Sequence, residues 1–250
     1  MPSFTYRTRW RAGAASALLL VALAALAGCG GDSPATRTIA GQSASATALQ
    51  RQFVEIVDAV SPAVVQIQSS QGLGSGIVFN DRGNIVTNAH VAGNQTRFTV
   101  TLSAGGRYPA TLVGRDPGND LAVIHVTGAT PAPAAFADSS KARVGDLVLA
   151  IGNSLGLQSS VSQGIVSSLD RRVGEGDGAT LSSAIQTSAE INPGNSGGAV
   201  VDLSGRVLGI PTLAALDPEL GGAQAPGIGF AIPSNTVQNV ASGLIASAGI

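Results

Sequence analysis

Short apolar runs separated by turn residues fill most of the chain. In the first half they are AVVQIQ, SGIVF, NIVTNA, RFTVTL, PATLVG and LAVIHV, each four to seven residues long and rich in β-branched side chains. The second half has the same pattern of short apolar runs, which are LVLAIG, SSVSQGIVSSL, SAIQTS, GAVVDL, RVLGI and IGFAI. Two sets of about six strands predict an all-β fold of two packed antiparallel six-stranded β-barrels, over about 62–136 and 144–233.

Amphipathic helical patterns flank the strands. QFVEIVDAV, which begins at residue 52, predicts a short N-terminal helix that ends at Pro62. SNTVQNVASGLIASAG predicts a C-terminal helix, with Ser234 as its N-cap. With these helices, residues 52–250 form one compact domain.

The first 28 residues follow another pattern. A basic segment precedes an apolar run over 12–27, which is typical of a secretory signal and short for a membrane span. The run ends in LAGC, which resembles a bacterial lipobox and implies cleavage before Cys29 and a diacylglycerol on its thiol. The alternative is an ordinary export signal cut after Ala27.

Residues 1–28 are therefore assigned to a signal peptide, and 29–51 to the lipidated cysteine and a flexible tether of small polar residues. Both versions of the signal place the mature protein in the cell envelope, in the periplasm or on the outer face of a membrane. Because Cys29 is the only cysteine, no internal disulfide is expected.

Composition excludes some classes of partner. The 250 residues are 44% hydrophobic, with a formal net charge of −1, which suits a soluble protein with a sizeable core. Without a basic surplus, nucleic acid is not an expected partner.

A glycine-rich stretch, EINPGNSGGAV, surrounds Ser196. Gly194 and its neighbours allow a tight turn whose N–H groups point to one place, as an oxyanion requires. A serine nucleophile needs a histidine base and an orienting acid. His90 lies near the end of a predicted strand and Asp120 follows a Pro-Gly turn, so both can face a cleft.

The other histidine, His125, alternates with Ile124 and Val126 on a predicted strand, which makes it an exposed face residue. GNSGG also fits the nucleophile elbow of α/β-hydrolases, but that fold needs a histidine after the serine, and none follows Ser196. The order His90, Asp120, Ser196 is that of trypsin-like enzymes.

Six stretches together resemble the HtrA/Deg family of trypsin-like serine proteases, over about 53–240. They are GSGIVFNDRGNIVTNAHV, DPGNDLAVIHV, VLAIGNSLGL, SQGIVSSL, IQTSAEINPGNSGGAVVDLSGRVLGI and IGFAIPSNTV. The resemblance implies His90 as general base, Asp120 as its orienter and Ser196 as nucleophile. It also implies an oxyanion hole made by the backbone N–H groups of Gly194 and Ser196, and no metal or cofactor.

Several positions depart from the family pattern. Ser188 replaces an acid, and Pro211 lacks an N–H in the segment expected to pair with substrate. PDZ domains, common after this domain in the family, are not expected within these 250 residues.

Specificity and regulation are also implied only by the resemblance. Glu190 holds the position at the base of the specificity pocket, where it either favours a basic substrate side chain or points to solvent. Ile191 and Leu213 are the apolar pocket candidates. Arg171 matches an arginine that senses activation.

The predicted function is that of an extracytoplasmic serine endopeptidase that hydrolyses unfolded or damaged envelope proteins. Unfolded polypeptides, the membrane (through Cys29) and a homotrimer are the implied partners. The alternative is a chaperone-like or adaptor protein on the same fold with little hydrolysis.

Overall fold

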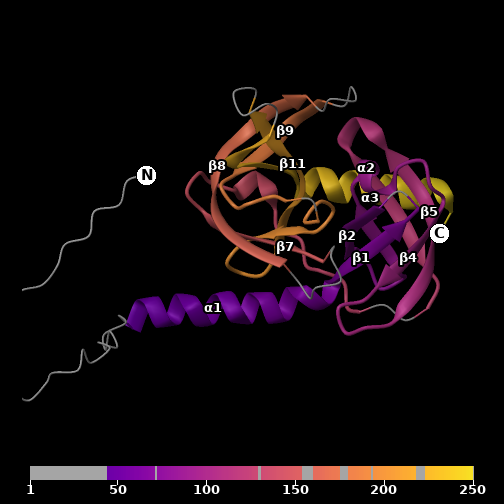
Figure 1. The fold of residues 1–250 in the computed structure, drawn as a ribbon, viewed down its shortest axis with the longest axis horizontal. Coiled ribbons are helices and arrows are strands. Elements are labelled where there is room, and N and C mark those ends of the chain that lie inside the picture. Colours follow the sequence, from indigo (N-terminus) through magenta and orange to yellow (C-terminus); the bar gives the residue numbers. More distant parts are fainter. Residues whose placement is uncertain are drawn as a thin grey trace, which may run out of the picture. The chain divides into compact units, whose positions relative to one another are not determined.

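The computed structural model describes residues 44–249, except 71, 129–130, 154–159, 175–179, 193 and 218–222 (Figure 1). The predicted signal peptide, Cys29 and most of the tether lie outside the described residues. Among the residues that are described, no helix has both the length and the hydropathy needed to cross a bilayer.

Barrel one is a closed antiparallel sheet in the order β1-β2-β3-β6-β5-β4. Its strands are β1 (Val64–Ser69), β2 (Gly72–Val78), β3 (Asn84–Thr87), β4 (Arg97–Thr101), β5 (Arg107–Asp116) and β6 (Leu121–Val126). Two one-turn helices interrupt it, α2 (Ala89–Ala92) and η2 (Pro117–Asn119).

Barrel two closes in the order β10-β11-β12-β9-β8-β7. Its strands are β7 (Leu147–Gly152), β8 (Ser160–Gly174), β9 (Thr180–Thr187), β10 (Ala199–Val201), β11 (Val207–Asp217) and β12 (Ala223–Pro233). Each barrel has six strands, so the predicted architecture is confirmed.

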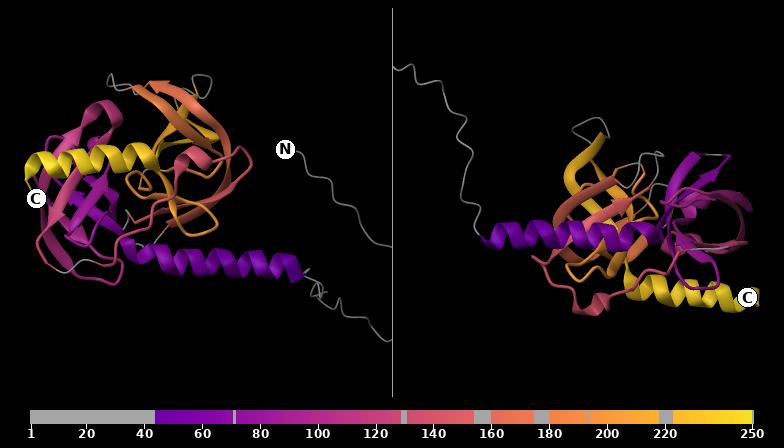
Figure 2. Two further views of the ribbon diagram at one scale, coloured as in Figure 1. Left: turned by 180° about the vertical axis from the view of Figure 1, so that it is seen from behind. Right: turned by 90° about the horizontal axis from the view of Figure 1, so that it is seen from below.

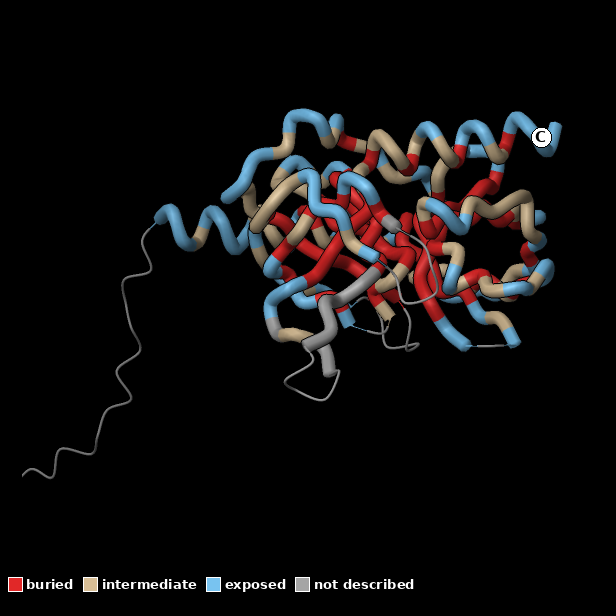
Figure 3. The backbone as a smooth tube through the Cα atoms, turned by 90° about the horizontal axis from the view of Figure 1, so that it is seen from above, coloured by how far each residue is buried: buried red, intermediate tan, exposed pale blue. Residues whose placement is uncertain are grey.

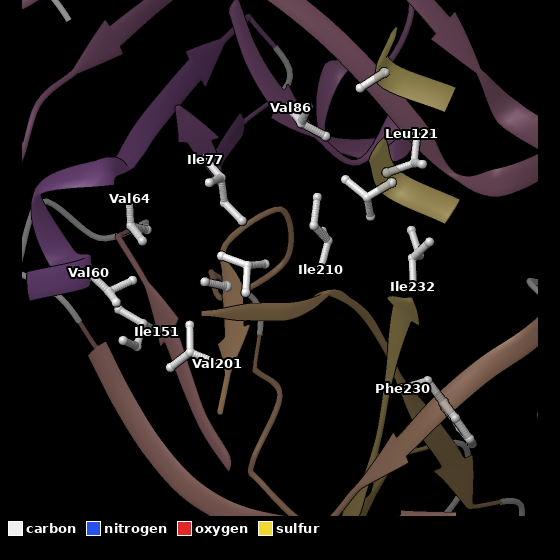
Figure 4. Packing of buried hydrophobic residues seen from close by; sticks show 14 of the residues in the cluster. Val60, Val64, Ile77, Val86, Leu121, Ile151, Val201, Ile210, Phe230 and Ile232 are labelled. Carbon is white, nitrogen blue, oxygen red and sulfur yellow. The ribbon is translucent and has the colours of Figure 1, made fainter. Parts of the chain in front are cut away.

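Both faces of many strands are buried, which explains why the apolar runs are nearly continuous (Figure 3). On β2, Ile77 belongs to a cluster that joins the two barrels, while the next residue, Val78, belongs to the interior of barrel one. The alternation on β3 is the same, since Val86 faces the shared cluster and Ile85 the interior. Figure 4 shows this shared cluster, which includes Ile77 of barrel one and Ile151 and Ile210 of barrel two.

The N-terminal helix α1 (Ala44–Val60) begins earlier than the residue 52 expected, so 44–51 is helical rather than part of a flexible tether (Figure 2). This segment is rich in alanine, the best helix former, which extends a helix that tertiary contacts already anchor. Ile56 and Val60 are buried, and Gln52 Nε2 donates to the Leu203 carbonyl at 2.8 Å.

The C-terminal helix α3 (Ser234–Ala248) buries Val237, Ala241 and Ile245, which recur every fourth residue. The sequence predicted Ser234 as the N-cap of α3, and this prediction is wrong, because Pro233 takes that position. The Ser234 hydroxyl donates instead to the Ala137 carbonyl at 2.7 Å, just before η3 (Ser139–Lys141).

The shared cluster predicts a difference between two isoleucines on β12. Ile232 is 1% exposed within the cluster, whereas Ile228 is 37% exposed. Ile232→Ala should lower the free energy of unfolding by about 2–5 kcal/mol, because it leaves a cavity between the barrels. Ile228→Ala should cost less than about 1 kcal/mol. If chemical denaturation gave equal decreases in the free energy of unfolding for the two variants, this packing would be contradicted.

Candidate active site

His90 and Asp120 form a hydrogen-bonded pair in barrel one. His90 lies in the one-turn helix α2 directly after β3, rather than on the strand itself. The His90 Nδ1 is 2.8 Å from Asp120 Oδ2, and the His90 backbone N–H donates to Asp120 Oδ1 at 2.9 Å. With Nδ1 as the donor to a carboxylate, Nε2 is left as the acceptor that a general base requires.

The local backbone holds Asp120 in place. Asp116 caps η2 by accepting from the Asn119 N–H at 3.2 Å, and the helix ends at Asp120 in the left-handed region, with φ 49°. Aspartate tolerates this conformation better than most residues. The Asp120 side chain is 2% exposed, and its carbonyl accepts from the Ala89 N–H at 3.1 Å, so the acid also anchors the start of α2.

Thr212 of β11 connects this pair to the serine. Its hydroxyl donates to Asp120 Oδ2, and its carbonyl accepts from Ser196 Oγ at 3.2 Å. We did not predict Thr212 from the sequence. The available signal was a hydroxyl residue directly after Pro211 on the strand beside the active-site turn.

Ser196 lies in a tight turn between β9 and β10. The turn is closed by the Gly198 N–H, which donates to the Asn195 carbonyl at 2.8 Å. Gly194 and Gly197 have φ of 126° and 82°, values that favour glycine. A Cβ on Gly197 would lie 2.1 Å from the Ser75 carbonyl oxygen of barrel one, so the turn touches the other barrel.

One cavity brings the predicted residues together. It measures about 230 Å³ and is lined by Gly194 and Ser196 of barrel two and by His90 of barrel one. Its other lining residues are Ser69, Gly72, Leu73, Gly74 and Val91. Within the described part of the chain, no cluster of three or more His, Cys, Asp or Glu residues suited to a metal ion is found.

The pocket candidates differ in burial. Ile191 is 4% exposed and packs on Gly229, where a Cβ would approach Ile191 Cγ1 to 2.4 Å. Glu190 is exposed, and its carbonyl accepts from Ser162 Oγ at 2.7 Å. The Leu213 backbone pairs with Phe230, and its side chain lies outside what the structure describes.

The residues that depart from the family pattern have specific contacts. The Ser188 hydroxyl accepts from the Ile165 N–H of β8 at 3.1 Å. The Pro211 carbonyl accepts from the Gly197 N–H at 3.1 Å, so this proline contributes to the turn through its oxygen.

Two further candidates lie elsewhere on the barrels. Arg171 is exposed, and its Nε donates to Gln186 Oε1 at 3.1 Å. His125 is half-buried rather than exposed, because its Nδ1 lies 3.3 Å from Oδ1 of the buried Asn84.

The contact at Gly197 predicts that an added methyl group lowers the free energy of unfolding more there than at Gly105. Gly105 has φ 88°, but a methyl group added there would have nothing within 4 Å, so Gly105→Ala should cost only the strain of about 1–2 kcal/mol. Gly197→Ala adds a clash with backbone and should exceed about 4 kcal/mol. Equal decreases in the free energy of unfolding, measured in urea, would mean that the turn does not touch β2.

Comparisons of this chain with known proteins all point to peptidases. The family model described as trypsin-like peptidase domain matches residues 74–210. The chain is 45% identical to the periplasmic serine endoprotease DegP of Escherichia coli over 182 residues, 72% of this chain and 37% of DegP. It is 40% identical to the serine protease PepD of Mycobacterium tuberculosis over 214 residues, 77% of this chain and 46% of PepD.

Among solved structures, the HtrA-type protease AlgW with a decapeptide aligns with a TM-score of 0.69 and 30% identity. The alignment covers 78% of this chain and 68% of AlgW. The chain spans less than half the length of the curated relatives DegP and PepD.

Proposed function

Because the chain belongs to the trypsin-like peptidase family, and within it to the HtrA-type proteases, we propose that it is a serine endopeptidase acting on unfolded or damaged envelope proteins. The observation that carries the proposal is the 2.8 Å contact between His90 and the buried Asp120, beside a cavity that His90 and Ser196 share. The names of the relatives support a polypeptide substrate and an envelope location, since DegP is a periplasmic serine endoprotease and AlgW was solved with a peptide.

The proposed reaction begins at Ser196. Its Oγ attacks the carbonyl carbon of the scissile bond while His90 Nε2 takes its proton. The imidazolium gives that proton to the leaving amine, the C–N bond breaks, and an acyl-enzyme on Ser196 remains. Water, deprotonated by His90, then attacks the acyl carbonyl. The imidazolium returns the proton to Ser196 Oγ as the ester bond breaks, and the acid product leaves. Asp120 keeps its charge and stabilises the imidazolium through both steps.

The tetrahedral intermediates need donors for their oxyanion. The backbone N–H groups of Gly194 and Ser196 are assigned this role, since both lie in the turn at the edge of the cavity. Loss of one such donor typically costs about 2.7–4 kcal/mol of transition-state stabilisation.

An apolar substrate side chain is the expected occupant of the specificity pocket. Ile191 is buried against Gly229, so the wall that it contributes to the pocket is apolar and favours an apolar side chain over a charged one. Because Glu190 is exposed, we expect no preference for lysine or arginine at the cleaved bond. Leu213 remains the second pocket candidate, and Arg171 the candidate activation sensor.

Hydrolysis and covalent labelling test the triad. Wild-type protein should cleave an unstructured protein such as casein and react with a fluorophosphonate at Ser196. Ser196→Ala should abolish labelling, and His90→Ala should lower turnover by at least about 10⁴-fold, because the nucleophile loses its base. His125→Ala is the matched control and should cleave at the wild-type rate.

A folded wild-type protein that binds casein without cleaving it would support the chaperone-like alternative. Recovery of one folded partner on Ser196→Ala, in place of many unfolded chains, would support an adaptor. Cleavage by Ser196→Ala would sink the proposed mechanism.

The same proposal includes export and a lipid anchor at Cys29, and homotrimers as the assembly state that the family suggests. Metabolic labelling with a fatty acid should mark wild-type protein in the membrane fraction. Cys29→Ser should lose the label and the membrane association, because no thiol remains to carry diacylglycerol. An unlabelled mature protein beginning at Gly28 would show an ordinary export signal instead.

A further inference from the structure

We propose that Ser75 is a positioning residue that holds the oxyanion-binding turn from the opposite barrel. The inference rests on the proposed function. Ser75 lies on β2 of barrel one and is 0% exposed, whereas Gly194 and Ser196 belong to barrel two. Ser75 therefore acts through the turn.

Ser75 fixes the carbonyl groups of both residues assigned to the oxyanion hole. Its hydroxyl donates to the Gly194 carbonyl at 2.6 Å. Its backbone N–H donates to the Ser196 carbonyl at 3.0 Å. Because a carbonyl shares its peptide plane with the N–H of the next residue, these two bonds fix the 194–195 and 196–197 planes. The plane between them carries the Ser196 N–H, and the plane directly before them carries the Gly194 N–H. Both donors assigned to the oxyanion hole therefore project from an anchored turn.

The direction of the hydroxyl proton is also determined. A serine hydroxyl has one proton to donate and two lone pairs to accept. The Asn153 N–H donates to Ser75 Oγ at 2.8 Å, so one lone pair is occupied and the single proton points to Gly194. The Ser75 carbonyl accepts from Thr87 Oγ1 at 2.6 Å, which fixes Ser75 itself within barrel one.

The turn needs this restraint because Gly194 has no side chain to limit its rotation. Its φ of 126° lies where other residues rarely go, and glycine moves freely into other conformations. Without the Ser75 hydroxyl, the half-buried Gly194 carbonyl and the buried Asn153 N–H both lose a partner. An unpaired carbonyl favours rotation of the 194–195 peptide toward another donor, and that rotation displaces the turn that carries the Ser196 N–H.

Ser75→Ala tests the role by separating kcat from KM on a fluorogenic peptide. We expect kcat to fall about 100-fold, as for loss of an oxyanion donor, with KM changed less than about threefold. The second-order rate constant for fluorophosphonate labelling should fall with kcat, because the phosphonyl oxygen uses the same donors.

Ser234→Ala is the matched control. The Ser234 hydroxyl is also 0% exposed and also donates to a distant backbone carbonyl, that of Ala137 at 2.7 Å. Its loss should lower the melting temperature by about as much as Ser75→Ala while kcat stays within about twofold of wild type. A merely structural Ser75 would behave as this control does, and that result would overturn the proposal.

Ser75→Cys covers the case in which Ser75→Ala does not fold. The thiol is similar in size and keeps a weak donor, so the kcat of Ser75→Cys should lie between those of wild type and Ser75→Ala. Where Ser75→Ala gives no folded protein, the kcat of Ser75→Cys should still lie well below that of wild type. Unchanged kcat in Ser75→Cys and in any folded Ser75→Ala overturns the role of Ser75 alone. A wild-type protein that neither cleaves casein nor reacts with the fluorophosphonate overturns the proposed function, and this inference with it.

Discussion

The contact between β2 and the active-site turn is the constraint on which the site depends. Ser75 makes two hydrogen bonds to the turn, at Gly194 and Ser196, and two more to Thr87 and Asn153 outside it. The backbones approach so closely that a Cβ on Gly197 would lie 2.1 Å from the Ser75 carbonyl. The turn is covalently part of barrel two, but its position is set by barrel one. This explains why a glycine follows the serine, since a side chain at position 197 would not permit the approach.

The same division applies to the reacting groups. His90 and Asp120 come from barrel one, and Ser196 and Thr212 come from barrel two. Their relative placement therefore depends on how the barrels pack, which the shared apolar cluster decides (Figure 4). Protein interiors resist small displacements because they are close-packed, so this cluster keeps the site geometry as well as the fold. Stability and catalysis are consequently coupled through the residues between the barrels.

Much of this arrangement could be predicted from the sequence, because apolar runs and turn residues report local structure. The runs predicted two six-stranded barrels, and the chain order of His90, Asp120 and Ser196 indicated a trypsin-like site. The start of α1 at Ala44 was missed because small residues resemble a linker until tertiary contacts anchor the helix. Thr212 and Ser75 were missed because a hydrogen bond between barrels leaves no periodic signal along the chain. The sequence predicted His90 near the end of a strand but did not predict α2, because a one-turn helix is too short to show a period.

The bond from Ser196 Oγ to the Thr212 carbonyl gives the site a resting arrangement compatible with activity. A neutral hydrogen bond of this kind contributes only about 0.5–1.5 kcal/mol net, so turning the hydroxyl toward His90 is inexpensive. In the proposed reaction, a substrate backbone N–H that donates to the vacated Thr212 carbonyl would compensate for the loss. The Thr212 hydroxyl meanwhile keeps its bond to Asp120, so the acid does not move when the serine does. In the proposed function, binding of an extended chain along β11 would thus favour the rotamer that attack requires, without any rearrangement of the barrels.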